Sequence, residues 1–466
     1  MRFCLITLGC DKNTVDSERI VGTLVEHGAQ FVSNPANAEI ILVNTCAFID
    51  AAKEESIETL LAAARLKDTG SVRALVAVGC LVERYRDELA RSLPEVDLFL
   101  GLRDLPDLVP ELMVRGLLDK RLDEHPGGRL RVGGLRHSAY LKVSEGCDHK
   151  CAFCAIPLWR GRHRSFEAEH LVQEARALEA RGVVELNLVA QDLAHYGRDL
   201  DEKISLHDLL ERLLRRTDIP WFRLLYIYSA GLRAPLIELI AGEERILPYI
   251  DMPIQHASDS MLERMRRPER ADRLREKISW LRSEIPDLTL RTTLVVGFPG
   301  ETEDDFEALL DFIGDVRFDH LGAFAYSPQP GTPGAEMPDQ VPETVKMERL
   351  ALVSEQQRGI VAAANQAFIG RELELLIDKM ESEAGGEAPI EARRRGQALD
   401  IDGVTYVKTA TAPAIEVAPG DFVRATVTTA DDADLWATAR SIIRRAPAAF
   451  ERDELATLDL QSAWGR

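Results

Sequence analysis

The stretch AYLKVSEGCDHKCAFCAIPLWRGRHRS, residues 139–165, places an apolar strand directly before a loop with three cysteines. Cys147, Cys151 and Cys154 have the spacing C-x3-C-x2-C. Strand-like apolar runs then recur, separated by amphipathic helical runs, at 185–189, 222–227, 249–252, 290–296 and 320–324. This alternation predicts six βα units, a parallel TIM-type barrel or part of one, whose active site belongs at the carboxyl ends of the strands. The cysteine loop follows the first strand at that face.

Three thiols in one loop indicate a metal site. A structural zinc site normally has four ligands, and this loop offers three cysteines with His149 between them. A cubane iron–sulfur cluster held by three thiolates leaves one iron open, which the amino and carboxylate groups of S-adenosylmethionine can chelate. One-electron reduction then releases methionine and a 5′-deoxyadenosyl radical. The spacing, with Phe153 between the last two cysteines, resembles the radical S-adenosylmethionine superfamily, and zinc stays the alternative.

The first 118 residues repeat a strand followed by a helix, with a cysteine at each junction. The three junctions are Cys10 after the run 3–8, Cys46 after 39–44 and Cys80 after 73–78. Parallel strands present their carboxyl ends along one edge of the sheet, so we expect these thiols to converge although 36 and 34 residues separate them. The alternative is that each is a small buried apolar residue, which is what we expect of Cys4 inside the first strand.

Other strand ends of the middle segment carry residues that suit a cofactor. We expect the cofactor-binding set to consist of Glu185 and Gln191 from ELNLVAQD, Gln255 from PIQHAS, and Gly297, Gly300 and Glu301 from VGFPGE. The glycines would let the backbone approach the adenosine. An ordinary βα loop is the alternative at each position.

Chain length and a Gly-rich break in the sequence predict the domain organisation. At roughly 150 residues per domain, 466 residues correspond to about three domains. We expect a parallel α/β domain at 1–118, the barrel at 133–365 after a Gly-rich linker at 122–137, a small antiparallel β-barrel at 366–440 and an extension at 441–466. Strand-like pieces at 372–378, 404–409 and 421–428 underlie the small barrel.

Composition and net charge limit the cellular compartment and the kinds of partner that we expect. No apolar run approaches the roughly 20 residues of a membrane span and no signal peptide is recognisable, so we expect a cytoplasmic protein without a membrane partner. Seven cysteines in such a chain indicate metal, redox or packing roles rather than disulfides. The net charge of −20 repels polyanions and favours a basic partner protein over nucleic acid.

Six motifs together resemble the methylthiotransferase family of radical S-adenosylmethionine enzymes. They are LGCDKNTVDSE (8–18), NTCAFIDAAKEESIETLL (44–61), VGCLVERY (78–85), EGCDHKCAFCAIPLWRGRHRS (145–165), PIQHAS (253–258) and RTTLVVGFPGETEDDF (291–306). The resemblance covers roughly residues 3–435 and implies a C-terminal TRAM domain.

Two 4Fe–4S clusters are also implied by this resemblance. Cys10, Cys46 and Cys80 would ligate one, which carries a methylated sulfur on its open iron, and the catalytic Cys147, Cys151 and Cys154 would ligate the other. Two S-adenosylmethionine molecules would serve, one as methyl donor and one as radical source. An external electron donor and a sulfur donor are further implied partners.

The substrate branch follows from two of these motifs and from charge. NTCAFIDAAKEES and DKNTVDSE resemble the branch that methylthiolates the β-carbon of an aspartate in protein twelve of the small ribosomal subunit, free or on the ribosome. Residues 366–440 contain 8 Lys and Arg against 14 Asp and Glu. This net charge of −6 suits a basic protein better than tRNA. Arg393-Arg394-Arg395 is the exception, as either an RNA contact or a solvated turn.

Three rival interpretations stay open at this point. Methylthiolation of adenosine in tRNA is the nearest. The non-enzymatic rivals are an iron–sulfur electron carrier tethered to an interaction barrel, and a zinc-stabilised scaffold. The electron carrier predicts no 5′-deoxyadenosine, and the scaffold predicts zinc in place of iron.

Overall fold

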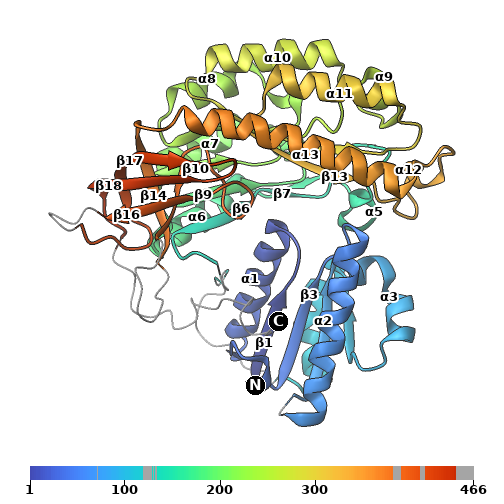
Figure 1. Cartoon of the computed structure of the whole chain (residues 1–466). Coiled ribbons are helices and arrows are strands. Elements are labelled where there is room, and N and C mark those ends of the chain that lie inside the picture. Colours follow the sequence, from blue (N-terminus) through green and yellow to red (C-terminus); the bar gives the residue numbers. More distant parts are fainter. Residues whose placement is uncertain are drawn as a thin grey trace.

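The computed structural model describes residues 1–70, 72–118, 129, 131, 134–380, 390–409 and 415–447. Most of the predicted linker at 122–137 and of the predicted extension at 441–466 lies outside these residues. Three β-structures follow one another along the chain: an open sheet, a larger curved sheet and a closed barrel (Figure 1). None of the helices in this described part has the length and hydropathy of a membrane span.

The N-terminal unit is a five-stranded parallel sheet in the order β2-β1-β3-β4-β5. Its strands are β1 (Arg2–Thr7), β2 (Gln30–Phe31), β3 (Ile40–Thr45), β4 (Ala74–Gly79) and β5 (Leu98–Leu100). Its helices are α1 (Asp11–Glu26), α2 (Asp50–Thr69), α3 (Cys80–Ser92) and α4 (Leu108–Val114). Every residue of β3 and β4 is buried, because separate apolar cores cover the two faces of the sheet.

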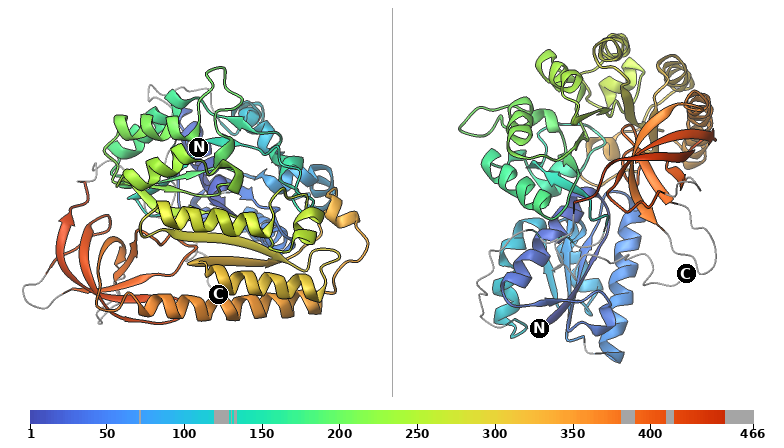
Figure 2. Two further views of the ribbon diagram at one scale, coloured as in Figure 1. Left: turned by 90° about the horizontal axis from the view of Figure 1, so that it is seen from above. Right: turned by 90° about the vertical axis from the view of Figure 1, so that its left-hand side faces the viewer.

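The middle unit is a six-stranded parallel sheet in the order β13-β12-β11-β10-β9-β6, with helices on its outer face (Figure 2). Its strands are β6 (Ser138–Lys142), β9 (Glu185–Val189), β10 (Trp221–Leu224), β11 (Ile246–Asp251), β12 (Thr289–Val296) and β13 (His320–Ala325). Its longer helices are α6 (Ala168–Ala180), α7 (Leu206–Arg216), α8 (Ala234–Gly242), α10 (Ala271–Glu284), α11 (Glu303–Val316) and α13 (Glu343–Gln366). β6 and β13 remain as open edges, so the prediction of a partial (βα)6 barrel is confirmed.

Five short elements lie in the loops of this partial barrel. They are β7 (Ser144–Glu145), α5 (Ile156–Arg160), β8 (Arg164–Ser165), α9 (Asp259–Arg264) and α12 (Pro333–Glu336). β7 and β8 pair with each other and enclose the cysteine loop and α5. This hairpin therefore holds the loop at the carboxyl end of β6.

The C-terminal unit is a closed barrel in the order β14-β15-β16-β18-β17. Its strands are β14 (Glu372–Met380), β15 (Ile390–Arg394), β16 (Thr405–Thr409), β17 (Phe422–Ala430) and β18 (Leu435–Arg444). The small barrel is confirmed, with two differences: β15 and β18 were not among the predicted strand-like pieces, and β16 and β18 pair in parallel. Alternating directions cannot close around an odd number of strands, so one of the five pairs has to be parallel. The long helix α13 joins this barrel to the middle unit along one side (Figure 1).

Candidate active site

Three cysteines of the N-terminal unit meet at the carboxyl edge of its sheet. The strands β1, β3 and β4 are neighbours, and Cys10, Cys46 and Cys80 stand just beyond their ends. Gly9 has a φ of 88°, and a Cβ on it would lie 2.8 Å from Cys46 Sγ. Only glycine therefore allows the Cys10 loop to pack this closely on Cys46. The structure thus brings together three residues that are far apart in sequence.

The other three cysteines lie in the loop between β7 and α5. Backbone hydrogen bonds fix this loop: the Cys147 amide donates to Gly161 (3.1 Å), and the Ala152 amide donates to Met265 (2.9 Å). The Gly334 amide in turn donates to the Ala152 carbonyl (2.8 Å). Both peptide groups of Ala152, the residue after Cys151, are thus bonded to segments at α9 and α12, which holds the loop in place.

Electrostatics couples the thiols within each group of three. Burial raises the pKa of Cys80 and of Cys154 to about 12, and that of Cys147 to about 11. The neighbouring cysteines of the same group push each of these pKa values in the same direction. All seven cysteines are free thiols. Such sites need a strongly positive group to hold thiolates, and the donor sets therefore fit a bound metal cofactor.

The spacing of the sulfurs bears on the choice between one zinc ion and a cluster. Among the described residues, three candidate ligand atoms lie within 4.8 Å of one another only in His149–Asp192–His195 and His207–Asp208–Glu211. Neither group of three cysteines, all of them described, meets this limit. Thiolates around one tetrahedral zinc, each about 2.3 Å from the metal, lie roughly 3.8 Å apart. At least one sulfur–sulfur distance in each group therefore exceeds 4.8 Å, which fits a multi-iron cluster.

His149 belongs to a polar group beside the cysteine loop. Asp192, which ends the motif ELNLVAQD, accepts hydrogen bonds from His149 Nε2 and His195 Nδ1, each at 2.8 Å. The ring of His149 stacks on Tyr228 at 4.1 Å. Burial opposes ionisation of Asp192, but the bonds from His149 and His195 outweigh it and lower the pKa of this carboxyl well below its usual range. His149 therefore fastens the loop to the barrel.

Two of the predicted cofactor residues lie at the carboxyl ends of barrel strands. The amide of Gln191 donates to Glu145 (3.3 Å), and Gln255 links to β12 through its backbone in a left-handed conformation, with a φ of 71°. Strained backbone of this kind concentrates at functional sites.

Asp11 Oδ2, Gln191 Oε1 and Arg267 Nε are buried without a hydrogen-bond partner among the described residues. Each such atom costs about 1–3 kcal/mol, so a polar cofactor would stabilise this mouth of the barrel.

Gly297, Gly300 and Glu301 lie where contacts within the protein, rather than contacts with a cofactor, account for them. A Cβ on Gly297 would collide with Lys346 of α13, and one on Gly300 would lie 2.5 Å from Arg264. Glu301 accepts from the Gly297 amide and from Arg349, both at 2.7 Å. Protein packing already explains these glycines, and the Glu301 carboxylate is engaged within the protein.

Glu185 lies at the wrong end of the sheet for the predicted cofactor role. It is the first residue of β9, so its side chain stands at the amino end of the strand, opposite the cysteine loop. Its fully buried carboxylate accepts from Arg393 (2.7 Å), Arg223 (3.0 Å) and Ser138 (2.8 Å). Glu185 therefore joins the C-terminal barrel to the middle unit and does not belong to the cofactor site.

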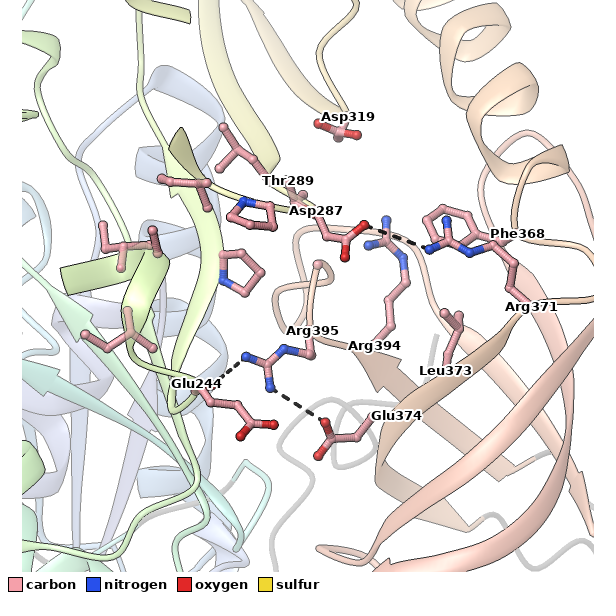
Figure 3. A pocket seen from close by; sticks show the side chains of 18 of the residues that line it. Glu244, Asp287, Thr289, Asp319, Phe368, Arg371, Leu373, Glu374, Arg394 and Arg395 are labelled. Atoms are coloured by element: carbon pink, nitrogen blue, oxygen red, sulfur yellow. Dashed lines mark hydrogen bonds and ion pairs between the residues drawn. The ribbon is translucent and has the colours of Figure 1, made fainter. Parts of the chain in front are cut away.

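The run Arg393-Arg394-Arg395 is not a solvated turn, because each side chain contacts other parts of the protein. Arg393 is buried between Glu185 and Asp378. Arg394 stacks on Phe368 at 4.6 Å, and Arg395 donates to the Glu244 carbonyl at 2.5 Å. Arg394 and Arg395 line a cavity of about 500 Å³ at the amino ends of the barrel strands (Figure 3). All three arginines therefore lie at the junction between the C-terminal barrel and the middle barrel.

We expect Glu185→Gln to lower the free energy of unfolding by about 3–5 kcal/mol, because it leaves two buried guanidinium groups undercompensated. Although burial opposes it, Arg393 and Arg223 lower the pKa of Glu185 far below its usual value. This contribution is therefore complete above the unfolded pKa of about 4.3 and is lost as the pH falls. Urea unfolding at pH 7 and at pH 4 measures both effects. The control Glu211→Gln, in an exposed pair with Arg215, should cost less than about 1 kcal/mol.

The first turns of α1 face the mouth of the middle barrel. Lys12 lies 3.3 Å above the ring of Tyr226, whose hydroxyl donates to Asp11 (3.4 Å). Tyr226 follows β10 at its carboxyl end. Residues of the motif DKNTVDSE therefore begin α1 and also contact the middle unit. Sequence patterns alone did not indicate these partners.

Three family models match the chain, one to each unit. An uncharacterised protein family, UPF0004, matches residues 2–101, the radical SAM superfamily matches residues 141–313, and the TRAM domain matches residues 369–439. A solved structure with a similar fold is the radical S-adenosylmethionine methyltransferase TsrM from Kitasatospora setae, with cobalamin and a [4Fe-4S] cluster bound. The TM-score is 0.52 at 14% identity, over 72% of this chain and 76% of that one.

Full-length relatives are more similar. The ribosomal protein uS12 methylthiotransferase RimO of Anaeromyxobacter sp. (strain K) is 47% identical over 439 residues, 93% of this chain and 92% of the relative. The protein of the same name from Desulforudis audaxviator is 46% identical over 450 residues, 95% of this chain and 98% of the relative. The similarity thus extends through all three units.

Proposed function

The chain belongs to the family of ribosomal protein uS12 methylthiotransferases, and we propose that its six clustered cysteines hold two 4Fe–4S clusters that divide the reaction between them. The chain is a radical S-adenosylmethionine enzyme that transfers a methylthio group to ribosomal protein uS12. The acceptor we propose is the β-carbon of an aspartate. The observation that carries this proposal is the presence of two separate groups of three thiols, each at the carboxyl edge of a parallel sheet.

Membership of the radical SAM superfamily implies S-adenosylmethionine and one 4Fe–4S cluster, and Cys147, Cys151 and Cys154 are the residues that would hold this cluster. When bound, it supplies the electron that cleaves S-adenosylmethionine to the 5′-deoxyadenosyl radical. Gln191 and Gln255 would orient S-adenosylmethionine at the strand ends. Gln191 Oε1 and Asp11 Oδ2 are buried and have no hydrogen-bond partner within the described part of the chain, which supports a polar occupant at this place.

Cys10, Cys46 and Cys80 would hold the second cluster. Cys46 and Cys80 are buried, whereas Cys10 is exposed. This arrangement supports a cluster with one side open to the barrel mouth, where sulfur has to reach the substrate. Anaerobic iron and sulfide analysis tests the proposal: two clusters predict about eight iron atoms per chain, and a single cluster predicts about four.

The acidic C-terminal barrel supports a basic protein as substrate, and its three neighbouring arginines are used within the protein. We propose uS12, free or within the ribosome, as the partner, and we do not expect tRNA to be one. An external electron donor and a sulfur donor complete the set, in the cytoplasm where ribosomes work. The domain boundaries that we propose are 1–118, 133–365 for the radical SAM core and 366–440 for the TRAM domain, with an extension at 441–466.

We expect the reconstituted enzyme to add the mass of one methylthio group to uS12 and to leave tRNA unchanged, because the module at 366–440 repels polyphosphate. Mass spectrometry of both substrates after parallel incubation with S-adenosylmethionine and a reductant measures this. Enzyme without reductant is the control. Modified adenosine in tRNA, together with unmodified uS12, would contradict the substrate assignment.

A further inference from the structure

Arg160 connects the two groups of cysteines. It is the last residue of α5, the helix that starts two residues after Cys154. Its guanidinium nevertheless lies in the N-terminal unit, where Nη2 donates to Cys80 Sγ at 3.4 Å and to Asn13 Oδ1 at 2.6 Å. Arg160 is only 8% exposed. A residue from the loop of one proposed cluster thus contacts a proposed ligand of the other.

The surroundings hold this guanidinium in place from two sides. Nη1 donates to both oxygens of Glu145, at 2.9 Å and 3.0 Å, and to Asp16 at 3.3 Å. Lys142 pairs with the same two carboxylates. Trp159, the preceding residue, is buried in the core of the N-terminal unit. The side chain is therefore fixed by ion pairs and packing rather than by the thiol alone.

Asn13 links Arg160 to all three cysteine loops. Its fully buried side-chain amide donates to the carbonyls of Leu8 (2.8 Å) and Thr45 (3.1 Å), which precede Cys10 and Cys46. Its oxygen accepts from Arg160 and lies 3.7 Å from Cys80 Sγ. The Asn13–Arg160 pair thus spans the whole edge at which the three thiols meet.

Negative charge gathers at this edge, so a cation beside it is favourable. Three ligating thiolates bring a charge of −3, which an oxidised 4Fe–4S core of charge +2 offsets only in part, and Asp16 and Glu145 add −2 beside them. Among the described residues that contact these two carboxylates, Lys142 and Arg160 are the cations, and Arg160 is the one that reaches a sulfur. Hydrogen bonds and positive charge at cluster sulfurs raise the reduction potential and stabilise ligation.

We propose that Arg160 is a positioning residue of the N-terminal cluster: it donates a charge-assisted hydrogen bond to Cys80 Sγ, holds this ligand in place and raises the reduction potential of the cluster. This inference rests on the proposed function, since it needs a cluster on Cys10, Cys46 and Cys80. It also makes the cysteine loop of the barrel and the N-terminal cluster parts of one rigid assembly.

The test uses the full-length chain with Cys147, Cys151 and Cys154 all replaced by Ala, so that only the N-terminal cluster can form. Iron analysis comes first: about four iron atoms per chain are expected. A chain without iron in this background would refute the second cluster itself. When iron is present, a redox titration followed by electron paramagnetic resonance gives the potential of this single cluster, and that value tests Arg160 separately.

We expect Arg160→Met in this background to shift the potential downward. A tenfold lower ratio of reduced to oxidised cluster at a fixed applied potential corresponds to 59 mV for one electron. Arg160→Lys retains the charge and should recover part of the shift, and Arg160→Gln, which retains only a donor, should recover less. The matched control is Arg162→Met, because Arg162 lies two residues along the chain with a side chain 93% exposed. Its potential should equal that of the background.

Two outcomes would overturn the role of Arg160. One is an unchanged potential in Arg160→Met with full iron content. The other is equal loss of iron from Arg160→Met and Arg160→Lys, which would show that only the packing of the arginine matters. Loss of iron from Arg160→Met that Arg160→Lys restores supports the proposal, because the lysine returns the charge but not the shape of the guanidinium.

Discussion

Replacing Cys154 by Ala should abolish the formation of 5′-deoxyadenosine. A site with two thiolates cannot hold the cluster in the geometry that leaves one iron open for S-adenosylmethionine. Even the loss of an outer partner of a metal ligand costs about 10–100-fold, so we expect the loss of a ligand to exceed about 100-fold. Anaerobic incubation with S-adenosylmethionine and dithionite, followed by chromatography of the nucleosides, measures the product.

The matched control is Cys4→Ala. Cys4 is fully buried in β1 and donates to the Ser33 carbonyl at 3.4 Å, far from a ligand role. Its replacement removes one sulfur from a packed core, as the replacement of Cys154 does, and should leave deoxyadenosine formation near the wild-type rate. Product formation by Cys154→Ala at more than a tenth of the wild-type rate would refute this thiol as a cluster ligand.

The convergence of Cys10, Cys46 and Cys80 could be predicted because it follows from topology. Each cysteine directly follows an apolar run, and parallel strands align their carboxyl ends whatever the length of the connections. The order β1-β3-β4 in the sheet then brings the thiols together. The two shortest strands of this N-terminal sheet, β2 and β5, were missed, since two or three residues carry no periodic signal.

The role of Glu185 could not be predicted because its partner lies 208 residues away, in a different unit. The predicted run 185–189 already makes Glu185 the first residue of its strand, at the amino end, so the expectation of a cofactor role was wrong from the sequence itself, and only the contact with Arg393 needed the structure. Arg393 shows the same limit. A run of three arginines usually lies in solvent, and only the docked barrel reveals that one of them is buried against a carboxylate.

Arg160 is the most informative case of this kind. In sequence it is one of several basic residues after the cysteine loop, and nothing distinguishes it from Arg162. In the structure Arg160 is buried on Cys80 and Arg162 is exposed. The glycine between them, with a φ of 73°, follows the end of α5. Contacts between units thus decide the function of side chains that local patterns leave equivalent.

Replacing Cys80 by Ala should separate the two halves of the reaction: deoxyadenosine formation should largely persist, while methylthio transfer to uS12 should fall by more than about 100-fold. The barrel loop keeps its own anchors to Gly161 and Met265, and Arg160 keeps Asp16, Glu145 and Asn13 as partners. The radical site is therefore preserved when the N-terminal cluster is lost. Parallel assays of nucleoside and of modified uS12, with the iron content of each sample, measure the separation.

Cys10→Ala is the companion variant that makes this separation a test of ligation rather than of folding. Cys10 is exposed, so its removal leaves no cavity, whereas Cys80 is buried beside α5. The same phenotype in both variants, with about half of the iron lost, follows only when both thiols hold one cluster. An equal fall of both activities in Cys10→Ala would contradict the division of roles, because radical formation would then depend on the N-terminal cluster.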